Sequence, residues 1–285
     1  LLLLTASAVI PGRSIAPAYR PPARMEWDEV PADIQELDVA FGDELFLLGY
    51  RVLSERTQVG EDLTLELYWL ARKAMQDNYT FYVHVFGREE ARIGGIDTYP
   101  GGGLYPTRLW LPGEVLRERY SIAISEEAQA PVAATIRVGV YTLPNITYLP
   151  ASDAQGRDLS PSAPIGRVAI DPAQAVAYQP SKPLQVNLGN LVQLIGYDAF
   201  PTTPLVDQPW EVTLYWKCLA NIPRDYTVFM HLFNSQGERV TQVDQQPLAG
   251  SYPTSYWRVG EQIRDTHRIN LPAGLPPDTY TLQVG

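Results

Sequence analysis

Apolar and polar residues alternate along much of this chain with the two-residue period of a β-strand. Residues 63–69 (LTLELYW) place three leucines and Trp69 on one face, and residues 210–216 (WEVTLYW) place Trp216 on the matching face. Residues 79–86 (YTFYVHVF) alternate in the same way. Further strands are expected near residues 45–53, 92–97, 115–124, 134–142 and 165–170. No window has a convincing helical period, and short alternating strands between turns are typical of an all-β sandwich or barrel.

The chain contains an internal repeat with an offset of 147 residues. Gly49-Tyr50 recurs as Gly196-Tyr197, and the Leu-Tyr-Trp of residues 67–69 recurs at residues 214–216. Aligned without a gap, residues 48–120 and 195–267 are identical at 21 of 73 positions. Unrelated sequences would match at roughly one position in fifteen to twenty. The sequence therefore predicts two tandem domains of one all-β sandwich type, either immunoglobulin/fibronectin III-like or jelly-roll-like.

The repeat also sets the expected domain boundaries. The first sandwich is expected over residues 38–171 and the second over residues 184–285, joined by a linker at residues 172–183 (PAQAVAYQPSKP), which is rich in Pro and Ala. About 30 residues follow residues 138–139 in copy one, and none follow the matching Val284-Gly285. We therefore expect copy two to be truncated, without its last strand or two. Residues 275–284 resemble the tyrosine-corner strand of such sandwiches, in which a Tyr hydroxyl bonds nearby backbone; copy one has no matching Tyr.

The first ten residues, LLLLTASAVI, are apolar but too few to span a bilayer. We expect residues 1–12 to be the end of a transmembrane helix and residues 13–37 to be an extended connector. An ordinary apolar strand or helix is the alternative for the first segment.

Composition narrows the function classes. The chain has 285 residues, of which 45% are hydrophobic, and its formal net charge is −10. Such a surface repels phosphate, which argues against nucleic acid as a partner and against docking on anionic lipid. The single cysteine, Cys218, cannot form an internal disulfide or a Cys-rich zinc site, so no metal and no cofactor are expected.

Two kinds of side chain repeat in positions that invite a catalytic interpretation. His84 and Asp97 recur as His231 and Asp244, and we expect each pair to meet across adjacent strands as a structural hydrogen bond. A catalytic or metal-binding pair is the alternative, but one His and one Asp are an incomplete metal set, and no nucleophile lies nearby in sequence. The glutamates at 114 and 261 lie in different domains at equivalent turns, so they are expected to be turn residues rather than a glycosidase pair.

The loop before the fifth repeated strand carries Tyr-Pro-Thr and, three residues later, Trp in each copy. Exposed aromatic rings beside hydroxyls and carboxylates suit sugar binding, because sugars present flat C–H faces. The alternative is that the loop folds back and its rings cap the end of the sandwich, since a long loop needs such anchors. The candidate ligand-binding residues are Tyr105, Trp110, Tyr252, Tyr256 and Trp257.

The motif series LLGY, LYW, YTFYVHVF and YPT..W..GE, preceded by a Leu-rich stretch and SIAPAYRPP at residues 14–22, resembles a known group of proteins. It is similar to the C-terminal extracytoplasmic tails of large multispanning bacterial membrane proteins that resemble dolichyl-phosphate-mannose-type (GT-C class) glycosyltransferases. The resemblance implies a membrane-anchored region on the extracytoplasmic side of the cell membrane. That family's catalytic acidic residues lie in upstream membrane-proximal loops, so it implies no catalytic residue here.

We therefore expect a non-catalytic accessory region of a glycosyltransferase-like membrane protein, which contacts carbohydrate or lipid-linked sugar through the Tyr-Pro-Thr/Trp loops. The resemblance implies membrane attachment through the N-terminal helix. The alternative is a ligand-free spacer or protein-interaction module on the cell surface. Solvent-facing loop rings would favour binding, and rings packed on the core would favour the spacer.

Overall fold

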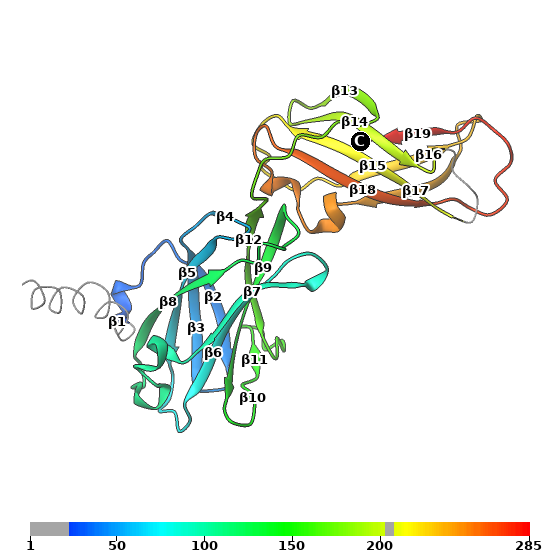
Figure 1. Cartoon of the computed structure of the whole chain (residues 1–285). Helices are drawn as coiled ribbons and strands as arrows, with labels where there is room; N and C mark the ends of the chain where they lie inside the picture. The colour runs from blue at the N-terminus through cyan, green and yellow to red at the C-terminus, as the bar shows by residue number, and fades with distance from the viewer. Residues whose placement is uncertain (1–22, 203–207) are drawn as a thin grey trace, which may run out of the picture. The chain divides into compact units, whose positions relative to one another are not determined.

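The computed structural model describes residues 23–202 and 208–285, and this part of the chain contains strands and short 3₁₀ turns but no α-helix. The chain forms two compact units (Figure 1). Unit 1 extends to Asp171 without residues 131–133, and unit 2 consists of these three residues together with Pro172–Gly285. The all-β fold expected from the alternation is confirmed. The expected transmembrane segment, residues 1–12, lies outside the described residues, as does the first part of the expected connector. No helix within the described ranges is long and apolar enough to cross a membrane.

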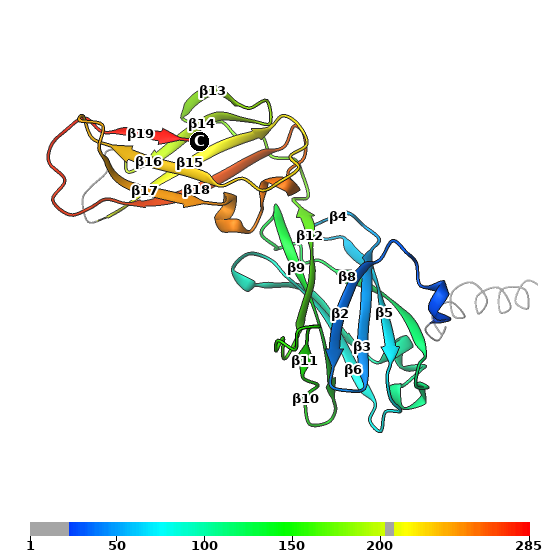
Figure 2. The same ribbon diagram turned by 180° about the vertical axis from the view of Figure 1, so that it is seen from behind.

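Unit 1 is a sandwich of two sheets. The first sheet has the strand order β1-β8-β5-β3-β2-β11 and the second has the order β4-β12-β9-β6-β7, with β10 paired to β9 (Figures 1 and 2). The pairing of β4 with β12 is parallel, whereas β5 pairs antiparallel with β3 and β8, and β6 pairs antiparallel with β7 and β9. The strands are β1 (Ala23–Met25), β2 (Gln35–Phe41), β3 (Leu45–Val52), β4 (Arg56–Gln58), β5 (Asp62–Ala71), β6 (Tyr79–Phe86), β7 (Arg92–Thr98), β8 (Val115–Ala123), β9 (Val132–Thr142), β10 (Thr147–Tyr148), β11 (Ala151–Ser152) and β12 (Ala163–Asp171).

Unit 2 repeats this plan with fewer strands among its described residues. Its sheets have the orders β13-β14-β15-β18 and β17-β16-β19. The strands are β13 (Lys182–Leu188), β14 (Val192–Phe200), β15 (Pro209–Cys218), β16 (Val228–Phe233), β17 (Arg239–Gln245), β18 (Gln262–Asn270) and β19 (Thr281–Val284). The 3₁₀ turns of the chain are η2 (Trp27–Glu29), η3 (Arg88–Glu90), η4 (Pro100–Gly103), η5 (Thr107–Leu109), η6 (Pro247–Gly250) and η7 (Thr254–Tyr256).

The alternating residues face the core as the period predicts. On β5 the side chains of Leu63, Leu65, Leu67 and Trp69 are fully buried, and on β15 Trp216 is 2% exposed. Trp69 stacks on Phe81 of the opposite sheet, with ring centroids 4.7 Å apart. The core of unit 1 is thus built from the inward faces of β5 and β6, which the sequence identifies without further information.

The repeated Gly-Tyr pair marks a β-bulge in each unit. The pairing register shifts just before Gly49 in β3 and just before Gly196 in β14. A Cβ atom at Gly49 would lie 2.6 Å from the Gln35 carbonyl oxygen, and one at Gly196 would lie 2.6 Å from the Lys182 carbonyl oxygen. Only glycine permits such a close approach of two backbones at a bulge. This steric requirement explains why the pair recurs.

Two segments for which the sequence predicts no strand nevertheless contain strand residues. The expected connector, residues 13–37, includes β1, η2 and the start of β2. The expected linker, residues 172–183, ends in β13, which starts at Lys182. The bounds of β2 and β13 differ by the same 147 residues as the rest of the repeat. Because their side chains agree at few positions, the structure shows the match better than the sequence does.

Candidate functional site

The Tyr-Pro-Thr/Trp loops fold back onto their own units. The Tyr105 hydroxyl donates to the Leu109 carbonyl oxygen at 3.1 Å, and the Trp110 indole N–H donates to the Tyr105 carbonyl oxygen at 3.0 Å. In unit 2 the Tyr252 hydroxyl donates to the Tyr256 carbonyl oxygen at 3.0 Å, and Trp257 donates to the Tyr252 carbonyl oxygen at 3.1 Å. Each loop is therefore held by its own ring and backbone groups.

Burial excludes these loop rings as an open sugar platform. Tyr105 is 6% exposed, Trp110 1%, Tyr252 0% and Trp257 4%, while Tyr256 is half-buried against the core. Trp110 lies edge-on to the core ring Phe81, with centroids 5.7 Å apart. A sugar cannot stack on a ring whose faces already contact protein. The rings close the end of each sandwich, an arrangement that favours the spacer over ligand contact through these loops.

Hydrogen bonds of the remaining loop residues also attach each loop to its own unit. The Thr107 hydroxyl accepts the Tyr79 backbone N–H at 2.9 Å and donates to the Asp77 carbonyl oxygen at 2.8 Å. Thr254 makes the same two contacts in unit 2. The glutamates act as turn residues, since Glu114 accepts the Leu111 N–H at 2.9 Å and pairs with Arg24 at 2.7 Å. Buried backbone N–H groups need such partners, so the motif is explained by folding alone.

Sequence reasoning missed one pair of buried acids. Glu118 on β8 is 5% exposed and accepts the Gly101 backbone N–H at 3.0 Å, which ties η4 to the sheet. Burial raises the pKa of the Glu118 carboxyl to about 7, against the opposing effect of that hydrogen bond. Asp265 lies at the matching position of β18 and accepts the Leu248 N–H at 2.9 Å and a bond from His267 at 2.7 Å. The sequence signal that could have identified this pair is an acidic residue at an inward position of an otherwise apolar strand face.

The His–Asp pairs lie on the outward surface of the second sheet of each unit. In unit 1, His84 Nε2 and Asp97 Oδ1 are 2.7 Å apart, and the other Asp97 oxygen accepts the Tyr141 hydroxyl at 3.1 Å. Burial and the hydrogen bond to Asp97 raise the pKa of Tyr141, so its hydroxyl stays protonated as a donor. In unit 2, His231 and Asp244 are 2.8 Å apart. No three His, Cys, Asp or Glu side chains in the described ranges converge on a metal site.

Aromatic rings surround the His84–Asp97 pair. Tyr82 lies 4.7 Å from the His84 ring and 6.0 Å from that of Tyr141, measured between centroids. Tyr148 lies edge-on to Tyr82 at 6.1 Å, and its side chain is 46% exposed. We define the outer face of unit 1 as His84, Phe86, Asp97, Tyr141 and Tyr148, contributed by β6, β7, β9 and β10. These residues surround the Tyr82 ring, which is itself buried at 5% exposure.

Glycines on the neighbouring strands make room for these rings. A Cβ atom at Gly139 would lie 2.2 Å from the Tyr82 ring, and one at Gly95 would lie 2.7 Å from the His84 ring. The rings therefore lie down on the sheet rather than standing off it. The result is a surface of ring faces and edges with one carboxylate and one imidazole at its centre.

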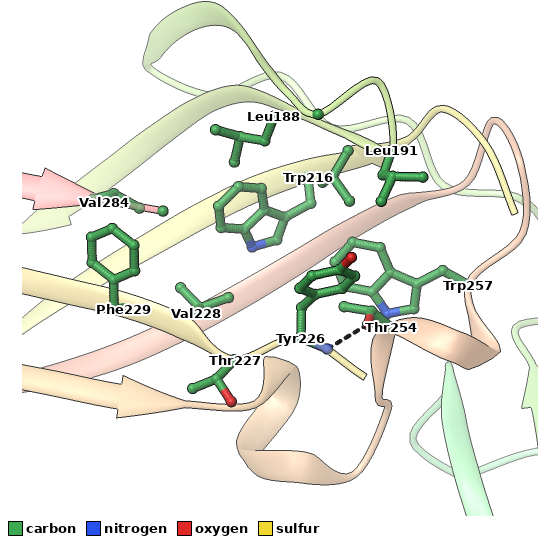
Figure 3. A pocket seen from close by; sticks show the side chains of 13 residues that line it. Leu188, Leu191, Trp216, Tyr226, Thr227, Val228, Phe229, Thr254, Trp257 and Val284 are labelled. Atoms are coloured by element: carbon green, nitrogen blue, oxygen red, sulfur yellow. Dashed lines mark hydrogen bonds between the residues drawn. The ribbon is translucent and has the colours of Figure 1, made fainter. Parts of the chain in front are cut away.

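Unit 2 contains an apolar pocket between its two sheets. The pocket has a volume of about 470 Å³, and Trp216, Trp257, Val228 and Phe229 are among its lining residues. Figure 3 shows Phe229 beside Val284 at one end of the pocket and Tyr226 beside Trp257 at the other. In unit 1 the position of Val228 holds Phe81, which pairs with Val140 of β9.

Comparison with known proteins supplies no identity. No model of a known protein family matches the chain, and no curated protein matches it. Among solved structures it is similar to the crystal structure of the C-terminal domain of wzt, with 8% sequence identity and a TM-score of 0.33. That match covers 54% of this chain and 92% of the other. The chain is thus defined by its fold, as a tandem pair of all-β sandwich units.

Proposed function

We propose that this chain is a non-catalytic accessory region that binds saccharide on the outer face of unit 1. The observation that carries the proposal is the set of outward rings beside the His84–Asp97 pair, namely Phe86, Tyr141 and Tyr148. Sugar rings pack their C–H faces on aromatic rings, and sugar hydroxyls bond carboxylates and imidazoles. Outward positions of a sheet normally carry polar residues, so an outward aromatic cluster suits a ligand surface better than a folding role.

The setting of this function rests on the sequence resemblance. We propose that the region stands on the extracytoplasmic side of the cell membrane as part of a glycosyltransferase-like protein, where its partner is carbohydrate or lipid-linked sugar. Catalysis then belongs to another part of the protein, in keeping with the absence of a matching catalytic residue in the resemblance.

Affinity electrophoresis tests the proposal. The chain is run through gels that contain α-mannan, dextran or a β-1,4-glucan, and we expect retardation in at least one of them. Tyr148→Ala removes the most exposed ring of the outer face and should weaken that binding about tenfold. Trp27→Ala removes a 64% exposed ring that lies outside the face and should leave binding unchanged. Normal mobility in all three gels would contradict the proposal.

The buried loop rings favour a second candidate, a ligand-free spacer or protein-interaction module. Tyr105, Trp110, Tyr252 and Trp257 all contact protein, which is the arrangement expected for a spacer. In that case no polysaccharide retards the chain, and Tyr148→Ala behaves like Trp27→Ala.

A further inference from the structure

The outward surface of unit 2 repeats the central features of the outer face of unit 1. His231 lies between Phe229 and Phe233 on β16, as His84 lies between Tyr82 and Phe86 on β6. The ring centroids of Phe229 and His231 are 4.9 Å apart and those of His231 and Phe233 are 6.5 Å apart. The corresponding distances in unit 1 are 4.7 Å and 6.3 Å.

The central carboxylate is also held in the same way in both units. Asp244 bonds His231 with one oxygen and accepts the Gln242 side-chain N–H with the other, at 2.8 Å. In unit 1 the second oxygen of Asp97 is occupied by the Tyr141 hydroxyl. A different donor thus fixes the same orientation of the carboxylate. Phe229 is 38% exposed and Asp244 is 41% exposed, so this surface is open to solvent.

On the first sheet of each unit, some outward residues differ between the two copies. In unit 1 the buried Glu66 is paired with Arg119 at 2.7 Å, and burial, which alone would raise its pKa, is outweighed by hydrogen bonds from Arg119, Arg51 and Tyr68 that lower it to about 2. The matching positions in unit 2 hold Thr213 and Thr266, whose hydroxyls bond each other at 2.9 Å. Unit 2 keeps a charged cluster on this face but with another acid, since the Tyr215 hydroxyl donates to Asp198 at 2.6 Å. On the second sheet, by contrast, the His, the Asp and the flanking rings keep both their positions and their chemical character.

We infer that unit 2 carries a second saccharide site, formed by Phe229, His231, Phe233, Gln242 and Asp244, and that the chain engages a repeating polysaccharide at two equivalent sites. The inference rests on the proposed function of unit 1. A polymer that repeats one sugar unit offers a ligand to each of the two sites. A short oligosaccharide fills each site separately. Stoichiometry therefore distinguishes one site from two.

Titration calorimetry on the whole chain supplies that stoichiometry. The probe is mannotriose, isomaltotriose or cellotriose, matched to the polysaccharide that retards the chain. We expect two trisaccharides per chain for the wild type and one each for His84→Ala and His231→Ala. Either variant should also be retarded less than the wild type in the polysaccharide gel, because each has lost one of two sites. Asp244→Asn, which keeps the shape of the side chain, gives the same reading if His231→Ala fails to fold.

The outcomes separate the two proposals. One trisaccharide per wild-type chain, with binding lost in His84→Ala and retained in His231→Ala, overturns the second site and leaves the function of unit 1 standing. Two trisaccharides in both unit 2 variants also overturns it, since the second site then lies elsewhere. Failure of every polysaccharide and trisaccharide to bind overturns the proposed function and this inference with it.

Discussion

At the scale of single residues, the fold places acids at inward positions and uses them as loop anchors. Glu118 holds η4 through the Gly101 N–H, and its carboxyl has a pKa raised by burial to about 7. The ordinary value of 4.5 applies in the unfolded chain. The folded state therefore holds a proton that the unfolded state releases between these two pH values. Stability contributed by this group is complete below pH 4.5 and is lost as the pH rises towards 7.

This linkage predicts the behaviour of Glu118→Gln, which keeps an acceptor for Gly101 but cannot ionise. The unfolding free energy of the variant minus that of the wild type should grow by about 3 kcal/mol between pH 4.5 and pH 7.5. Urea denaturation at a series of pH values measures this difference. Glu127→Gln, at an exposed position, serves as the control and should show no such growth. Parallel pH profiles for Glu118→Gln and the wild type would mean that Glu118 is ionised at neutral pH in the folded chain.

At the scale of elements, the two units fill the space between their sheets with side chains of different size. In unit 1 Phe81 of β6 fills the core against Trp69. In unit 2 the smaller Val228 takes the place of Phe81 and lines an apolar pocket beside Trp216. Unfilled apolar space lowers stability because its lining loses contacts. We expect the free energy of unfolding of unit 2 to be lower than that of unit 1.

Exchanging the two side chains tests this account. Val228→Phe should raise the unfolding free energy of unit 2 by about 1 kcal/mol by filling the pocket, whereas Phe81→Val should lower that of unit 1 by roughly 2–3 kcal/mol. Hydrogen exchange resolved by residue reports on each unit separately. Val259→Phe makes the same substitution at a 66% exposed position and should change little. Destabilisation by Val228→Phe would show that the pocket is closed in solution.

At the scale of the whole molecule, the chain has two cores rather than one. Each compact unit buries its own tryptophan on the central strand of its first sheet, Trp69 on β5 and Trp216 on β15. A core that closes within one unit can be lost without the other.

We therefore predict two unfolding steps that respond to different substitutions. Trp69→Ala should destabilise unit 1 by about 3–5 kcal/mol and leave unit 2 unchanged, and Trp216→Ala should do the reverse. Thermal unfolding followed by circular dichroism shows how many steps there are, and hydrogen exchange assigns each step to a unit. A single transition that shifts with either substitution would show that the units unfold together.

The sequence by itself determined the long alternating strands, their inward faces and the duplication, whereas β2 and β13 became apparent only in the structure. Strict alternation at residues 63–69 and 79–86 specifies which side chains share a face, because successive residues of a strand point to opposite sides. The glycine of the repeated Gly-Tyr pair is required because two backbones approach too closely there for a Cβ atom. These features are local, so no tertiary information was needed to find them.

Only the tertiary structure decided which aromatic rings meet solvent. The loops at residues 97–114 and 244–261 have no period, and the partners that bury their rings come from distant segments, such as Phe81 against Trp110. The contact of His84 with Asp97 was expected from the sequence, but the rings around it were not, because Tyr141 and Tyr148 lie far along the chain. Exposure is a property of packing between segments, and a pattern along one segment does not contain it.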